Sequence, residues 1–245
     1  MVRTEKNFLP SLFFNKNKYV VIKQAISNDL ATFCYNYFLM KKQVYDTCLE
    51  EEKAMGHFKH KAFKTSLLGL GRYESKNEQI PNTYSCYADI VMETLLLKCQ
   101  PLMEKHTGLK LLPTYSYARI YKNGDILQRH KDRQSCEVST TMFLGGDFWP
   151  IFLSPYENVG IHDGPNAKPG ITFSSGAKGV KVDLKHGDML VYDGMRLEHW
   201  REKFKGKICG QVFLHYNNKK TKGSEQNFFD QRPHLGLPLR FKKVI

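Results

Sequence analysis

The chain has 245 residues, and its 37 lysines and arginines against 24 aspartates and glutamates give a formal net charge of +13. A hydrophobic share of 41%, with 13% aromatic residues, is that of a globular protein and excludes wholesale disorder. No apolar run approaches the roughly 20 residues of a membrane-spanning helix, and the N-terminus lacks a secretory signal, so we expect an intracellular, cytoplasmic protein with no membrane partner.

Two helices are predicted in the first half of the chain. The segment 27–29 (Ser-Asn-Asp) offers an N-cap, and apolar residues then recur at helical spacing up to a predicted end before Gly56. A second helical stretch runs from about Asp89 to Gly108, and Pro101 inside it is expected to kink or break the helix. Loops and short strands are expected between the two helices.

After Gly108 the apolar period changes from near 3.6 to 2, which predicts strands. The first covers 112–121, and Asn123-Gly124 predicts a hairpin turn into a returning strand over 126–130. Later strand-like stretches cover 136–144, 149–153, 180–184, 189–192 and 208–216. Helices followed by many short strands indicate an α+β fold, a jelly roll with helices packed on one face.

No internal repeat or low-complexity tract divides the chain, so we expect one monomeric domain over 1–245. Residues 1–108 are predicted as a mainly helical N-terminal support, 109–217 as the jelly-roll core and 218–245 as a C-terminal extension. The long Gly- and Pro-rich stretch 160–179 is interpreted as a substrate-gating loop.

The triplet His130-Lys131-Asp132 is a candidate metal site, because residues i and i+2 of a strand point to the same face. A second such triplet, His186-Gly187-Asp188, lies between two short strands, where Gly-Asp predicts a hairpin turn. His199, just beyond another strand, offers a third ligand. Two imidazoles and one carboxylate leave adjacent positions open on Fe(II), as oxygen chemistry with a chelating cosubstrate requires.

Zinc is the rival metal. A structural zinc site takes four ligands, and the six cysteines include no C-x-x-C pair at a supporting spacing. The number and spacing of possible ligands therefore argue against a structural zinc site. The remaining histidines, among them His215, are interpreted as surface or core residues.

Two segments resemble one known family. The run 115–133 is similar to the R-x-Y-x-x-G-x-x-x-x-x-H-x-D motif of the Fe(II)/2-oxoglutarate-dependent oxygenases, in their prolyl-4-hydroxylase-like branch. The run 185–192, followed by His199, resembles the Gly-Asp turn and distal-histidine strand of that family. The resemblance covers roughly 109–217. It implies a double-stranded β-helix in which His130, Asp132 and His199 hold the iron and form the catalytic centre.

The same resemblance implies a hydroxylase that splits O2, decarboxylates 2-oxoglutarate to succinate and oxidises a C–H bond, with ascorbate left open as an auxiliary reductant. The family places a Lys or Arg about ten residues after the distal histidine to pair with the far carboxylate of 2-oxoglutarate. This chain has Ile208, Cys209 and Gly210 there. The anchor therefore stays open between Arg201 and Lys207, with Arg119 and Arg133 as further candidates.

Alternation places Tyr117, Arg119 and Tyr121 on one face of their strand, where they either line the pocket or form an aromatic sheet face. Tyr121 matches a family position that often contacts 2-oxoglutarate. Tyr117, Arg133 and Trp200 are the candidate substrate contacts, although Trp200 also suits a packing role.

The resemblance makes a peptide or protein side chain the expected substrate. Lysines and arginines gather in the last fifth of the chain, which keeps a nucleic-acid or nucleotide substrate as the alternative. A non-catalytic jelly-roll binding protein stays a third hypothesis, because the carboxylate anchor is unmatched.

Overall fold

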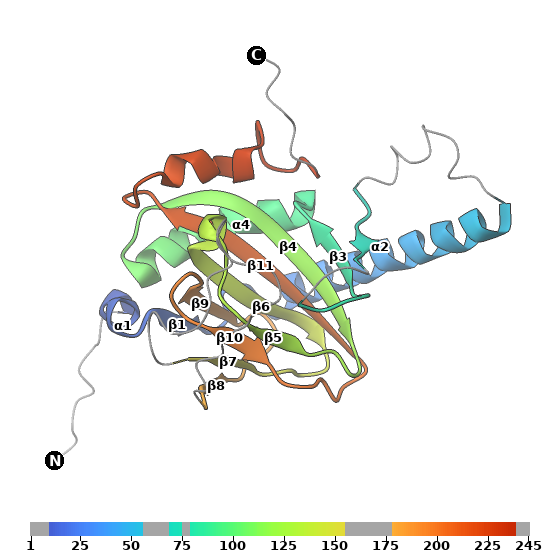
Figure 1. Ribbon diagram of the computed structural model, residues 1–245, viewed down its shortest axis with the longest axis horizontal. Coiled ribbons are helices and arrows are strands. Elements are labelled where there is room, and N and C mark those ends of the chain that lie inside the picture. The colour runs from blue at the N-terminus through green and yellow to red at the C-terminus, as the bar shows by residue number, and fades with distance from the viewer. Residues whose placement is uncertain (1–9, 56–68, 75–78, 155–177, 239–245) are drawn as a thin grey trace.

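The computed structural model describes residues 10–55, 69–74, 79–154 and 178–238. Helix α1 (Pro10–Asn17) leads into strand β1 (Tyr19–Ile22), and the 28-residue helix α2 (Asn28–Met55) follows with the predicted bounds. The second half of α2 extends beyond the body of the molecule (Figure 1). Among the described residues, no helix combines the length and apolar character needed to cross a membrane.

Helix α4 (Ile90–Thr107) has the caps that the sequence predicts. The Asp89 side chain accepts a hydrogen bond from the backbone N–H of Met92, and Gly108 closes the helix with a φ of 73°. The expectation that Pro101 kinks or breaks the helix is wrong in so far as the helix continues past it. The carbonyl that Pro101 leaves unpaired belongs to Leu97, which is 51% exposed, so water can bond it.

The larger sheet has seven strands in the order β1-β9-β6-β11-β4-β3-β2, all pairing antiparallel. Beyond β1, its strands are β2 (Arg72–Tyr73), β3 (Tyr84–Tyr87), β4 (Leu111–Lys122), β6 (Val138–Gly146), β9 (Met189–Asp193) and β11 (Ile208–Asn218).

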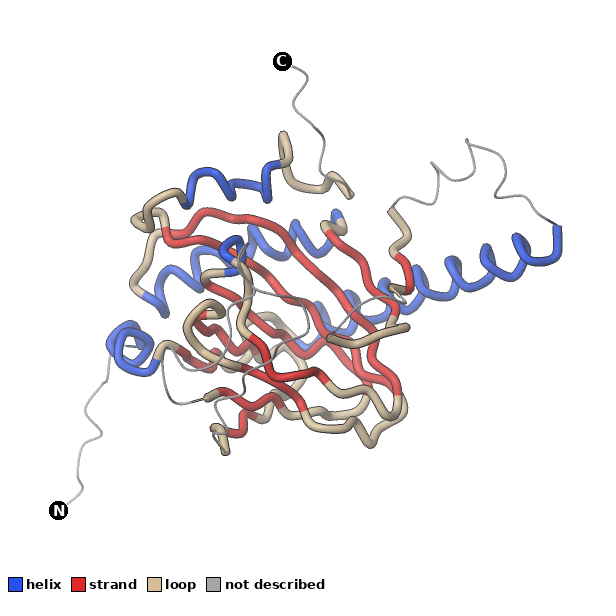
Figure 2. The backbone as a smooth tube through the Cα atoms, viewed as in Figure 1, coloured by secondary structure: helices blue, strands red, loops and turns tan. Residues whose placement is uncertain are grey.

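The smaller sheet has the order β5-β10-β7-β8 and is also antiparallel. It consists of β5 (Leu127–His130), β7 (Ile151–Leu153), β8 (Val180–Val182) and β10 (His199–Arg201). Figure 2 shows α2 and α4 behind the larger sheet and the smaller sheet in front of it. The predicted α+β jelly roll with helices on one face is therefore confirmed.

Two apolar clusters hold these layers together. One lies between the helices and the larger sheet and includes Phe38, Leu96 and Val212. The other lies between the two sheets and includes Trp149 and Leu190. Because successive strand residues alternate between faces, each long strand contributes to both clusters.

Both predicted hairpins are wrong, although both turns are present. Gly124 adopts the left-handed φ of 89° that an Asn-Gly turn requires, but β5 then pairs with β10 in the opposite sheet and not with β4. The turn containing Gly187 likewise connects β8 to β9, which belong to different sheets. In a jelly roll these turns carry the chain across the core, a choice that turn chemistry alone does not reveal.

Two 3-10 segments complete the fold: η2 (Gln134–Cys136) lies just before β6, and η3 (Ser224–Gln231) follows β11. In the predicted C-terminal extension, Leu235 packs against the helix-side cluster, whereas Phe228 is 41% exposed. Most of the predicted gating loop lies outside the described residues.

Candidate metal centre

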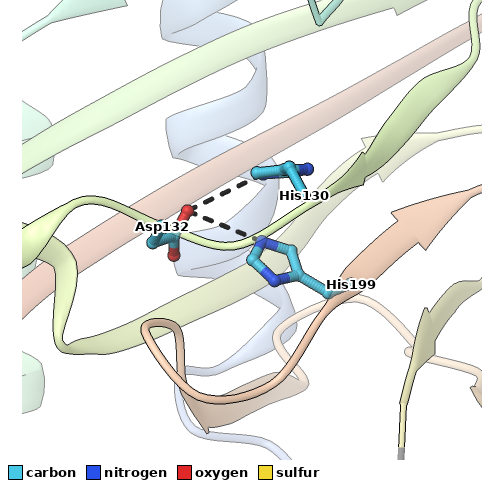
Figure 3. A group of neighbouring side chains, drawn as sticks. All are labelled: His130, Asp132 and His199. Atoms are coloured by element: carbon cyan, nitrogen blue, oxygen red, sulfur yellow. Dashed lines mark ion pairs between the residues drawn. The ribbon is translucent and has the colours of Figure 1, made fainter. Parts of the chain in front are cut away.

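The three predicted ligands come from two neighbouring strands of the smaller sheet. His130 ends β5, His199 begins β10, and the two residues are direct cross-strand partners with ring centroids 4.2 Å apart. Asp132 follows β5 and directs Oδ1 between the rings, 3.7 Å from His130 Nε2 and 3.6 Å from His199 Nε2 (Figure 3). One ligand atom from each residue lies within 4.8 Å of the other two.

Backbone carbonyls orient both imidazoles. His130 Nδ1 lies 2.7 Å from the carbonyl oxygen of Gln128, and His199 Nδ1 lies 3.0 Å from that of Leu197. A carbonyl only accepts, so each Nδ1 carries a proton, and in the neutral form of each ring Nε2 is the nitrogen with the lone pair. This is the tautomer that binds a metal through Nε2, with the carbonyl as the outer partner that holds the ring.

Two hydrogen bonds and the close approach of Gly194 fix the position of Asp132. Its Oδ2 accepts a 2.7 Å hydrogen bond from Ser139 Oγ, and its backbone N–H donates to the carbonyl of Gly194 at 2.8 Å. A Cβ on Gly194 would overlap the Asp132 carboxylate and lie 2.6 Å from the carbonyl oxygen of Cys136, so only glycine fits.

Electrostatics keep the ligands ready to bind a cation. Burial opposes ionisation of Asp132, but the neighbouring imidazoles of His199 and His130 outweigh burial and hold its pKa well below the usual range. Burial first, and then the charge of His199, lowers the pKa of His130 to about 4, so its imidazole is neutral at pH 7. Two neutral imidazoles and one carboxylate form the donor set of non-heme Fe(II) sites.

The triad borders a cavity of about 360 Å³ between the two sheets. Tyr117, Arg119, Tyr121 and Arg133 also line the cavity. Tyr121 is fully buried, and its hydroxyl has no hydrogen-bond partner among the described residues. Burial raises the pKa of Tyr121 to about 12, although the charges of Arg119 and Arg201 oppose the rise. The hydroxyl therefore stays protonated and can donate to a ligand.

Three other candidate residues lie less favourably. Arg133 is held by Asp230 through two hydrogen bonds of 3.0 Å each. Trp200 stacks on Phe152 and carries the guanidinium of Arg129 3.5 Å from its ring centroid; the cavity lining does not include it. Lys207 is exposed and is also absent from that lining.

Arg201 is 1% exposed and, like Trp200 and Lys207, does not itself line the cavity, but its charge acts on Tyr121, which does. Nη1 donates to the carbonyl of Trp149, Nη2 donates to Thr141 Oγ1 at 3.0 Å, and Nε has no partner. Within the described part of the chain, no carboxylate pairs with this guanidinium. A buried charge without a counter-charge is costly, and it is expected where an anionic ligand completes the site.

The sequence interpretation missed Ser139, Gly194 and His215. His215 lies on β11 in alternation with Gln211 and Phe213, so the period-2 rule applied to that strand could have placed it facing the cavity. No local pattern marks Gly194, since its partners Asp132 and Cys136 are distant in sequence. Ser139 follows Asp132 by only seven residues, but η2 lies between them, so strand alternation does not relate the two.

No protein-family model matches the chain, and no curated protein matches it in sequence. Solved structures do match it in fold. A prolyl hydroxylase from Trichoplax adhaerens, in complex with a peptide fragment of hypoxia inducible factor, has 13% identity and a TM-score of 0.56 over 86% of this chain and 89% of that chain.

A prolyl-4-hydroxylase from Pseudomonas putida has 12% identity and a TM-score of 0.51 over 86% of this chain and 100% of that chain. The epimerase SnoN, in complex with Fe3+, α-ketoglutarate and nogalamycin RO, has 12% identity and a TM-score of 0.56 over 94% and 91% of the two chains. At such identities the likeness establishes the fold, which is the jelly roll of these enzymes; activity has to be argued from the site.

Proposed function

We propose that this protein is an Fe(II)- and 2-oxoglutarate-dependent oxygenase in which His130, Asp132 and His199 hold the iron. The observation that carries the proposal is the convergence of two Nε2 lone pairs and one carboxylate oxygen at a cavity of about 360 Å³. Two ligand atoms on one ion, each about 2.1 Å from it, are at most about 4.2 Å apart, which the 3.6 and 3.7 Å separations satisfy.

Iron bound there would supply oxygen activation coupled to the decarboxylation of 2-oxoglutarate. The residues of the chain orient the iron ligands and exclude water. The carbonyls of Gln128 and Leu197 fix the histidine tautomers, and Ser139 orients the Asp132 carboxylate. The inter-sheet apolar cluster, which includes Trp149, keeps bulk water from the inner end of the cavity.

Arg201 is the proposed anchor for the far carboxylate of 2-oxoglutarate. It is buried and has no counter-charge among the residues that the structure describes, whereas Lys207 is exposed to water. The unpaired Nε and the planar guanidinium suit a carboxylate, and the nearby Tyr121 hydroxyl can add a second donor. The anchor would thus lie on β10, two residues after the distal histidine, and not on the final strand.

For the substrate we propose a peptide or protein side chain that is hydroxylated. The motif over 115–133 supports this class, and the Trichoplax enzyme with a similar fold is seen with a peptide.

The test is an anaerobic titration of the protein with Fe(II) and then 2-oxoglutarate, followed through the visible charge-transfer band of the chelated pair. We expect a band in the wild type, no band in His199→Ala, and a much weaker 2-oxoglutarate affinity in Arg201→Gln. Lys207→Gln is the matched control and should behave as the wild type. If iron binds but the wild type gives no band, the proposed function is wrong; if only Lys207→Gln loses affinity, the anchor assignment is wrong.

A further inference from the structure

His215 is a buried histidine beside the metal centre that the proposed chemistry does not use. It is 6% exposed, lines the cavity, and packs against Tyr115 with ring centroids 4.6 Å apart. Its Nδ1 lies 2.9 Å from Ser139 Oγ, the same hydroxyl that bonds Asp132. Burial lowers the pKa of His215 to about 4, so the ring is neutral at pH 7 and carries one proton.

The proton count on Ser139 determines which nitrogen of His215 carries that proton. Ser139 Oγ has one hydrogen and three close partners: Asp132 Oδ2 at 2.7 Å, the Cys136 carbonyl at 2.8 Å and His215 Nδ1 at 2.9 Å. The ionised carboxylate is the strongest acceptor of the three. Once Ser139 donates to Asp132, two lone pairs would face each other unless His215 Nδ1 donates to Ser139. The proton is therefore on Nδ1.

His215 Nε2 is then a bare acceptor in the cavity wall. Within the described part of the chain, no protein group donates to it. The cosubstrate cannot do so either, because ionised 2-oxoglutarate has two carboxylates and a ketone and no hydrogen-bond donor. Nε2 is not among the buried atoms of the described residues that lack a partner, so it borders the open space of the cavity, where water can bond it. A ligand that displaces this water loses affinity unless it offers a donor of its own, so a donor from another molecule is expected there when the site is filled.

We propose that His215 is a substrate-binding residue, whose Nε2 accepts a hydrogen bond from an N–H or O–H group that the substrate carries next to the oxidised carbon. This inference rests on the proposed function and narrows its substrate class. A backbone amide of a peptide has such a donor. A hydrocarbon substrate, or one whose polar groups only accept hydrogen bonds, would leave Nε2 without a partner.

The tautomer can be measured without knowing the substrate. Protein labelled with 15N-histidine and loaded with diamagnetic Zn(II) and 2-oxoglutarate is suited to long-range 1H–15N NMR, which distinguishes protonated from bare ring nitrogens. We expect protonated Nδ1 and bare Nε2 for His215, and loss of that fixed pattern in Ser139→Ala. A proton on Nε2 in the wild type would overturn the proposal, because the ring would then offer a donor to the cavity.

The donor requirement is tested with two matched probes, N-methylacetamide, which has one N–H, and N,N-dimethylacetamide, which has none. With Mn(II) and 2-oxoglutarate bound, paramagnetic broadening of the probe methyl signals reports binding near the metal. We expect the wild type to favour N-methylacetamide by about two- to tenfold, the value of one neutral hydrogen bond. His215→Asn should remove the preference, because its amide can still donate to Ser139 but cannot reach as far as Nε2.

The control variant is His234→Asn, which changes an exposed histidine and should keep the preference. Equal binding of the two probes by the wild type, or an unchanged preference in His215→Asn, would refute the proposal. His215→Phe, which preserves the ring volume, repeats the test if the Asn variant does not fold. The visible Fe(II)–oxoglutarate band separates the two hypotheses: a missing band in the wild type rejects the oxygenase assignment, whereas a normal band without probe preference rejects only the role of His215.

Discussion

Replacing Arg201 with methionine should stabilise the free protein and weaken cosubstrate binding at the same time. The guanidinium is 1% exposed and has no acidic partner among the described residues, so folding pays its desolvation without a compensating ion pair. Replacing even a buried ion pair with well-packed apolar side chains is often neutral or stabilising by about 1–4 kcal/mol, and a buried charge without a counter-charge should gain at least as much. The Trp149 carbonyl loses its donor in the variant, which costs about 1–3 kcal/mol. Taking the middle of both ranges, we expect a small net gain of about 0.5 kcal/mol in the free energy of unfolding.

With Fe(II) and 2-oxoglutarate present, the wild type should instead be more stable than Arg201→Met. A ligand at a hundred times its Kd stabilises the native state by about 2.7 kcal/mol. Two charge-assisted hydrogen bonds lost from Arg201 weaken 2-oxoglutarate by a factor of about a hundred or more, so the variant gains almost nothing from the same ligand concentration. Anaerobic urea unfolding with and without the ligands measures both effects.

Replacing Arg232 provides a control, because it should change the free energy of unfolding in the opposite direction. Arg232 is also buried, but it forms an ion pair with Glu93 at 2.6 Å. Arg232→Met leaves a buried carboxylate unpaired and should destabilise by about 3–5 kcal/mol. The reasoning is refuted if Arg201→Met is as destabilising as Arg232→Met, or if its 2-oxoglutarate affinity equals that of the wild type.

Gly194→Ala should push the Asp132 carboxylate aside and weaken iron about 10- to 100-fold, as loss of a group that orients a ligand does; unchanged Fe(II) affinity in a chelator competition would contradict this. Burial raises the pKa of Asp193 to about 6, so the stability linked to its protonation is present at pH 4 and lost as pH rises through 6. Asp193→Asn should therefore be more stable than wild type by up to about 3 kcal/mol at pH 8 and equal to it near pH 4 in urea unfolding. A peptide substrate predicts little loss of affinity between 50 and 200 mM salt, whereas a nucleic acid would lose it steeply, so oligonucleotide and peptide titrations at both salts separate the two classes.

Local sequence patterns determined much of the fold. The 3.6-residue period and the caps Asp89 and Gly108 predict α4, because caps satisfy backbone groups within a few residues. The change to period 2 predicts the strands of the core. The His-x-Asp spacing predicts two ligands together, since residues i and i+2 share a face of extended chain.

The sequence did not reveal which strands pair with one another. The turn at Gly124 is readable locally, but whether β5 returns to β4 or crosses to β10 depends on which pairing buries more apolar surface in the whole molecule. That crossing is what brings His130 opposite His199.

The tertiary structure alone also decided which charged and polar groups are buried. Arg201 and Lys207 are six residues apart and both carry a positive charge. Arg201 nevertheless lies between the sheets with no counter-charge in the described part of the chain, whereas Lys207 lies in water. Gly194 packs against Asp132, and His215 bonds Ser139, through contacts between segments that are distant in sequence. Desolvation and hydrogen-bond geometry determine what such groups can bind, and both arise only when the sheets close over the site.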